Sequence, residues 1–168
     1  MAHRGQWTIL KRERRNRKVK EILQEAIQGE VESYQLYTDA VKLVQAEHIQ
    51  ALLRDLAMEE LGHKTMLERM LADPGQLQWQ VEALQAAPIQ DYKIGDPLVA
   101  QPLRPDATFQ DVCIFASKKE QQSYELYRDM AEQNEGETRA LLEAMAKDEL
   151  RHKNLVESWY EDVVYQEF

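Results

Sequence analysis

An internal repeat built around two short motifs constrains this chain more than any other feature of its sequence. The motifs are residues 60–63 (ELGH) and 149–152 (ELRH), and further matching residues lie at the same spacing around them. A second pair of similar segments, residues 30–37 (EVESYQLY) and 120–127 (EQQSYELY), lies upstream of the motifs. Because Glu and His three positions apart share one face of a helix, each motif can direct both side chains to one ion. The chain is therefore predicted to contain a two-helix unit twice, with one isolated Glu and one Glu-x-x-His in each unit.

The acids and histidines of this repeat fall on the apolar seams of the predicted helices. The seam of the second helix reads Ile49, Leu53, Leu56, Glu60, His63, Leu67 and Met70. Steps of three and four residues are typical of the helix face that packs into a core. The pattern thus predicts an acid, or an acid and a histidine, near the middle of each core seam.

Carboxylates that converge in a core need a compensating charge. An unpaired buried carboxylate costs several kcal/mol or takes up a proton, and four of them would also repel one another. Two divalent metal ions would balance the charge of four carboxylates, and two neutral histidines would complete the ligation. The pattern therefore favours a dinuclear metal site over the alternative interpretation, a structural polar core without metal.

This arrangement resembles the ferritin-like di-iron carboxylate proteins and, among them, the rubrerythrin group. The resemblance covers about residues 20–165. It implies a set of six metal ligands: Glu30, Glu60, His63, Glu120, Glu149 and His152. Within this set, the family pattern implies that Glu60 and Glu149 bridge the two metals. The implied cofactor is two iron ions, although carboxylate and imidazole ligands without thiolate would also accept manganese or zinc.

Two tyrosines follow the isolated glutamates by two helical turns on the same face. In the family such tyrosines hydrogen-bond ligand carboxylates, so the resemblance implies this role for Tyr37 and Tyr127. The alternative is that they are core aromatic residues, and for Tyr34 and Tyr124 the two interpretations carry equal weight. Cys113 is predicted to be a small buried hydrophobic residue rather than a ligand.

The predicted fold class is all-α, a ferritin-like four-helix bundle with a long crossover between its second and third helices. Only six Gly and five Pro in 168 residues agree with helices throughout. We expect a basic N-terminal arm over residues 1–18 and the bundle over residues 19–168. The expected helices and crossover are 19–45, 47–71, crossover 72–105 with a short helix near 76–86, 106–133 and 138–160.

The net charge of −9 is unevenly distributed along the chain. Residues 1–20 hold eight of the 21 Lys and Arg and one acid, so the remainder is strongly acidic and a poor general binder of nucleic acid. The basic arm can contact nucleic acid or anionic lipid, but we favour a solvated helix start or tail, and nucleic acid is not an expected partner. No apolar run reaches the roughly 18–20 residues of a membrane span. The lack of a signal-peptide core and the single cysteine predict a cytoplasmic protein.

Two departures from the rubrerythrin pattern shape the functional prediction. Ser123 stands where rubrerythrins carry a second Glu, and Cys113 alone cannot build the paired Cys-x-x-Cys centre of a rubredoxin domain. The predicted function is a di-iron oxidoreductase, with no catalytic residue beyond the metal ligands. It would reduce peroxide or dioxygen with electrons from an external donor such as a rubredoxin-type protein, as a homodimer or small homo-oligomer. The alternatives are a ferritin-like iron-storage protein with ferroxidase activity and a metal-stabilised scaffold without turnover.

Overall fold

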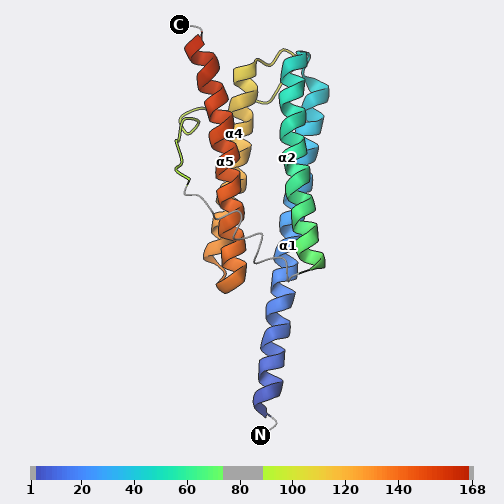
Figure 1. The fold of residues 1–168 in the computed structure, drawn as a ribbon. Helices are drawn as coiled ribbons and strands as arrows, with labels where there is room; N and C mark the ends of the chain where they lie inside the picture. Colours follow the sequence, from blue (N-terminus) through green and yellow to red (C-terminus); the bar gives the residue numbers. More distant parts are fainter. Residues whose placement is uncertain (1–2, 74–88, 167–168) are drawn as a thin grey trace.

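A computed structural model of the chain describes residues 3–73 and 89–166, with side chains described over 18–73 and 89–162. Among these residues the regular structure consists of helices, which are α1 (His3–Leu43), α2 (Glu47–Ala72), α4 (Phe109–Glu132) and α5 (Gly136–Gln166). Helix α1 packs along α2, and α4 packs along α5 (Figure 1). The predicted all-α four-helix bundle with a long connection between its second and third helices is confirmed.

The first helix is longer than the sequence pattern predicts. It begins at His3, so the segment expected to be a basic arm continues into the bundle as helix. Residues 6–28 contain neither Gly nor Pro and are rich in Lys, Arg, Glu and Gln, which are good helix formers. In Figure 1 the N-terminal part of α1 projects beyond the end of the bundle. Helix α5 also runs past its expected end near residue 160, to Gln166.

The crossover must travel the length of the bundle, because α2 and α4 run in the same direction (Figure 1). Its end meets the turn between α1 and α2, where the Gln45 N–H donates to the Pro105 carbonyl oxygen at 3.1 Å. Helix α4 then begins with a capping box, in which Thr108 and Asp111 each bond the other's backbone N–H group. The short helix expected near residues 76–86 lies outside the described residues.

The core is divided into two apolar clusters along the bundle. One includes Leu23, Leu67, Ala131 and Leu142, and the other includes Val44, Leu53, Val112 and Val156. On each helix the predicted acid lies between the residues that belong to the two clusters. The fold thus leaves a polar layer between two apolar layers, in the place where the seams predict it.

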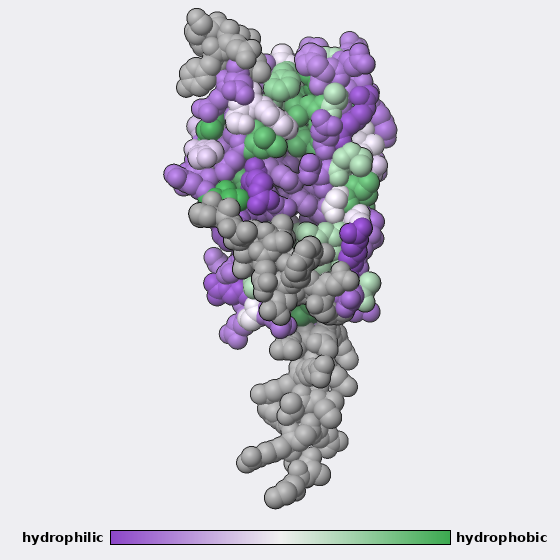
Figure 2. Space-filling model, in the orientation of Figure 1, coloured by the Kyte–Doolittle hydropathy of each residue, from purple (hydrophilic) through white to green (hydrophobic). Residues whose placement is uncertain are grey.

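The face of the molecule drawn in Figure 2 is largely hydrophilic, and its apolar side chains lie in smaller groups between the polar ones. None of the helices within residues 3–73 and 89–166 combines the length and the apolar character that crossing a membrane requires.

Candidate metal centre

The structure brings the six predicted residues together in the polar layer. Glu30 comes from α1, Glu60 and His63 from α2, Glu120 from α4, and Glu149 and His152 from α5. The four glutamates and His63 are buried, whereas His152 is half-buried. The three residues of the first repeat and their three counterparts from the second repeat therefore lie in one layer, with one residue from α1, two from α2, one from α4 and two from α5.

Ligand atoms of these residues form two overlapping groups. Glu30, Glu60, His63 and Glu149 each offer an atom, and these atoms lie within 4.8 Å of one another. The second group, with the same spacing, is Glu120, Glu149 and His152. Glu149 belongs to both groups, which is the placement that a bridging carboxylate needs. Glu60, the other residue with an implied bridging role, belongs only to the first group.

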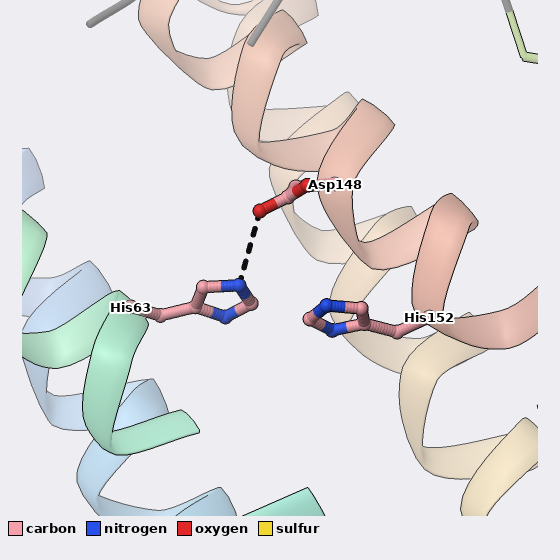
Figure 3. A group of neighbouring side chains, drawn as sticks. All are labelled: His63, Asp148 and His152. Carbon is pink, nitrogen blue, oxygen red and sulfur yellow. Dashed lines mark hydrogen bonds and ion pairs between the residues drawn. The ribbon is translucent and has the colours of Figure 1, made fainter. Parts of the chain in front are cut away.

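The imidazole of His63 lies between the carboxylates of the centre and an acid that the sequence analysis missed. Its Nδ1 lies 3.5 Å from Glu30 Oε2 and 3.4 Å from Glu149 Oε1. Its Nε2 lies 3.1 Å from Oδ2 of Asp148, an interaction drawn in Figure 3. Asp148 also pairs with Arg151, which lies one turn further along α5. Such a contact orients the ring and fixes which nitrogen carries the proton, so Nδ1 is directed to the centre.

The second histidine is arranged in a related way. His152 Nε2 lies 3.8 Å from Oε2 of Glu59, the acid before Glu60, just as Asp148 is the acid before Glu149. The two imidazole rings face each other, with centroids 4.9 Å apart and planes inclined by 9° (Figure 3). The repeat therefore extends to an acid before each Glu-x-x-His, a signal that was present in the sequence.

Tyrosine hydroxyl groups hold two of the carboxylates. The Tyr37 hydroxyl donates to Glu120 Oε1 at 2.5 Å, and the Tyr127 hydroxyl donates to Glu30 Oε1. Each tyrosine thus reaches the isolated Glu of the opposite repeat, and the geometry agrees with the implied role. By contrast, Tyr34 and Tyr124 are partly buried against the apolar clusters.

Burial and mutual repulsion shift the protonation of the centre. Burial, with a further contribution from Glu120, raises the pKa of Glu60 to about 8. Burial and then the Glu120 charge raise the pKa of Glu149 well above its usual value. Burial alone would lower the pKa of His63, but its bond to Asp148 and the nearby glutamates raise it overall. Without a cation, Glu60, His63 and Glu149 therefore tend to retain protons, whereas the pKa of Glu30 is lowered overall, because its contact with His63 opposes the effect of burial.

The donor atoms of the centre fit metal ions. Glu60 Oε2, His63 Nδ1, Glu120 Oε2 and both Glu149 carboxylate oxygens are buried and find no hydrogen-bond partner within the described part of the chain. Buried polar groups of this kind are costly unless something else satisfies them. Carboxylate oxygen and imidazole nitrogen without thiolate suit iron, manganese or zinc.

Two further residues singled out in the sequence lie apart from these groups. Cys113 is buried in an apolar cluster, and burial raises the pKa of its thiol to about 12. Ser123, which replaces a family carboxylate, accepts a hydrogen bond from Lys119 Nζ at 3.0 Å. Neither residue belongs to the two groups of ligand atoms.

Four helices around a buried set of four carboxylates and two histidines define a metal-carboxylate bundle of the ferritin-like kind. Residues 21–91 and 112–167 match the family model described as Rubrerythrin, and together they make up more than half of the chain. The chain therefore belongs to the rubrerythrin family. No curated protein and no solved structure matches it. Membership of this family implies metal binding, and the carboxylate–histidine groups could hold the metal.

Proposed function

We propose that this protein is a non-haem di-iron oxidoreductase that reduces peroxide or dioxygen with electrons from a separate donor. The observation that carries the proposal is that buried side-chain oxygen or nitrogen atoms of Glu60, His63, Glu120 and Glu149 find no hydrogen-bond partner in the described chain. They belong to residues from both repeats and meet between two apolar layers. A catalytic metal pair needs such a site, with ligands fixed in advance and bulk water kept out.

In this proposal each repeat supplies one ligand set. Glu30, Glu60 and His63 would hold the first iron, and Glu120 and His152 the second. Glu149, which belongs to both groups of ligand atoms, would be available to either iron. Two neighbouring irons can deliver two electrons together, which is the number needed to reduce peroxide to water.

The surrounding residues keep this ligand set in one arrangement. Tyr37 occupies one oxygen of Glu120, which leaves Oε2 for a metal. Asp148 holds Nε2 of His63, which leaves Nδ1 for a metal. The apolar clusters above and below limit access of water to the centre.

We propose an external electron donor, since one cysteine is too few for a rubredoxin-type centre within residues 1–168. A rubredoxin-type centre needs four thiolates. A small one-electron carrier, such as a rubredoxin-type protein, is the partner that this proposal requires. A homodimer or small homo-oligomer is the assembly that we propose, since a catalytic centre built within one chain needs no storage shell.

The test begins with metal-free protein that is loaded with Fe²⁺ under anaerobic conditions. Stopped-flow mixing with peroxide, and separately with dioxygen, should oxidise two irons per chain rapidly, and a reduced rubredoxin-type donor should restore the starting state. Iron uptake that continues far beyond two per chain would identify a storage protein instead. Stable metal binding without oxidation by either oxidant would identify a scaffold.

A matched pair of variants separates the centre from the helix that carries it. Glu60→Ala should bind much less iron and lose the oxidation step. Lys64 lies one turn further along α2, in a partly exposed pair with Glu68. The Lys64→Ala variant should therefore bind iron and be oxidised as the unmodified protein is. Equal iron content in the two variants would refute the proposed ligand set.

A further inference from the structure

The two halves of the centre differ in the acid that precedes each Glu-x-x-His. The Asp148 side chain is 12% exposed and is held between His63 and Arg151. The Glu59 side chain is 63% exposed and lies 3.8 Å from His152 Nε2, too far for a hydrogen bond. One histidine is therefore enclosed by a fixed partner, and the other faces a carboxylate that extends into solvent.

Two differences between the repeats accompany this contrast: the acid is Asp148 in one and the longer Glu59 in the other, and an arginine follows only Asp148 at the third position. Arg151, three residues after Asp148, holds that acid in place. The corresponding residue in the first repeat is Gly62, three residues after Glu59, which has no side chain with which to hold it. A Cβ atom added at Gly62 would meet no heavy atom within 4 Å, apart from its own chain neighbours and helix backbone. Position 62 therefore offers no side chain that could hold Glu59 in the way that Arg151 holds Asp148.

The two groups of ligand atoms that contain glutamates also differ, because the group around His63 has more ligands than the group around His152. The glutamate group around His63 consists of four residues, all of them buried, and the glutamate group around His152 consists of three. The two histidines also share a third group with Asp148, and their side chains are 8% and 12% exposed for His63 and His152. A cation held by more charged ligands binds more tightly and leaves more slowly.

We propose that Glu59 is the carboxylate through which one divalent metal ion enters and leaves the centre, at the His152 position, while the ion at the His63 position is held more tightly. This inference rests on the proposed two-metal function. An exposed carboxylate beside a half-buried ligand attracts a hydrated cation and can exchange its water for oxygen donors stepwise. Its long, unrestrained side chain can reach both solvent and the rim of the centre.

The experiment follows Co²⁺, which binds carboxylate and imidazole ligands and has visible bands that report on its coordination. Metal-free protein is mixed with Co²⁺ in a stopped-flow instrument, and loaded protein is then mixed with excess EDTA. We expect two ions per chain, with one entering and leaving faster than the other. Glu59→Gln should slow uptake and release of the fast ion by about fivefold, without a change in stoichiometry.

Further variants test the two sides separately. Gly62→Arg places an arginine three residues after Glu59, as Arg151 follows Asp148. This variant should also slow the uptake and release of the fast ion, whereas Gly62→Ala should not. Asp148→Asn should instead speed the loss of the slow ion. Asp55→Asn removes a charge from an exposed residue of α2 one turn before Glu59 and should leave both phases unchanged.

Three results would overturn the inference. Release of both ions at one rate would show that the two positions are equivalent, although the two-metal proposal would survive. Unchanged kinetics in Glu59→Gln, or equal slowing of both phases, would show that Glu59 is not the route. Binding of fewer than two ions by the unmodified protein would instead refute the two-metal function itself. Melting temperatures of the variants, measured without metal, establish that each is folded.

Discussion

Tyr37 and Tyr127 each place a buried hydroxyl group against a carboxylate of the opposite repeat. Burial, together with the charges of Glu120 and Glu30 respectively, raises the pKa of both phenols well above the usual value. Both therefore remain protonated donors at neutral pH. Because the hydroxyl of Tyr37 satisfies one oxygen of Glu120, the other oxygen is directed toward the centre.

Replacing Tyr37 by Phe should therefore weaken both the fold and the metal site. The change leaves Glu120 Oε1 buried without its donor, which should cost about 1–3 kcal/mol of unfolding free energy in the metal-free protein. Loss of a residue that orients a ligand should also weaken metal binding by roughly 10–100-fold. Urea unfolding and competition with a chromogenic chelator measure the two effects.

Tyr34→Phe is the matched control, since Tyr34 packs against the same apolar cluster but does not bond Glu120. It should change metal affinity little. Equal losses of affinity in the two variants would show that the effect comes from general repacking of the core.

For single residues, the sequence predicts the metal ligands that lie on the apolar faces of the helices, but not the acids next to those ligands. Glu60 and His63 are recognisable because an acid and a histidine interrupt an apolar series. Asp148 is one acid among 30 Asp and Glu, and its neighbour Arg151 gives it the appearance of an ordinary surface ion pair. Only the packing of α5 against α2 brings its carboxylate to His63.

At the scale of elements, a buried lysine joins the crossover to α5. The side chain of Lys153 is fully buried, and its Nζ lies 2.7 Å from Asp91, 3.0 Å from Glu157 and 3.5 Å from Asp96. Glu157 in turn accepts hydrogen bonds from the Gly95 N–H at 2.9 Å and from Ser117 Oγ at 2.9 Å. These contacts fix residues 91–96 against α4 and α5.

Lys153→Met should be strongly destabilising, because it leaves the buried Glu157 carboxylate without its cation. We expect a loss of about 3 kcal/mol of unfolding free energy. The internal repeat supplies the control: Lys64 pairs with Glu68 in the same sequence context, but both side chains are partly exposed. Lys64→Met should change stability by less than about 1 kcal/mol. Similar losses in the two variants, measured by urea unfolding, would contradict this account.

Replacing Gly95 by Ala is a second test of the contact between the crossover and Glu157, and Gly29 provides the control. A Cβ at Gly95 would lie 2.6 Å from Glu157 Oε1 and also too close to Ser117, so Gly95→Ala should displace the crossover and destabilise the fold. A Cβ at Gly29, in α1, would meet nothing within 4 Å beyond its own helix. Gly29→Ala should instead raise stability by about 0.5–1 kcal/mol, because Ala is the better helix former. Thermal unfolding distinguishes the two, and a stabilising Gly95→Ala would refute the close approach.

The helices could be predicted because their sequence is periodic, whereas the path of the crossover over the bundle could not. Seams with steps of three and four predict the helices and their middle layer. Residues 91–96 have no such period, and nothing local shows which surface they cover. The pairs Lys64–Glu68 and Lys153–Glu157 look alike in sequence, yet of these two pairs the described residues 91–96 of the crossover contact the second. Burial of that pair is thus a property of topology rather than of local pattern.

At the scale of the whole molecule, the centre makes stability depend on pH. In the folded, metal-free protein burial raises the pKa of Glu60 from an ordinary 4.5 to about 8. Between these pH values the folded state keeps a proton that the unfolded state has lost. A rise in pH therefore favours unfolding, by at most about 1.4 kcal/mol per pH unit for each retained proton. The raised pKa of His63 acts in the same direction above its ordinary value of 6.5.

The metal-free protein should accordingly melt at a lower temperature as the pH rises from 5 to 8. Metal ions bind deprotonated carboxylates and should oppose this trend, since each ion replaces protons with a charge that suits the ionised centre. The gain in melting temperature on addition of Zn²⁺ should therefore grow over the same range. Differential scanning calorimetry with and without Zn²⁺ measures both slopes.

Glu60→Gln provides the decisive comparison, because an amide of the same shape has no proton to lose. Without metal, this variant should show a shallower fall of melting temperature with pH than the unmodified protein. With Zn²⁺ it should gain less stability, since one ligand charge is missing. Lys64→Ala should follow the unmodified protein in both respects. If the melting temperature of the metal-free protein instead rises between pH 5 and 8, the buried carboxylates are already ionised, and repulsion within the centre is balanced by something other than protons.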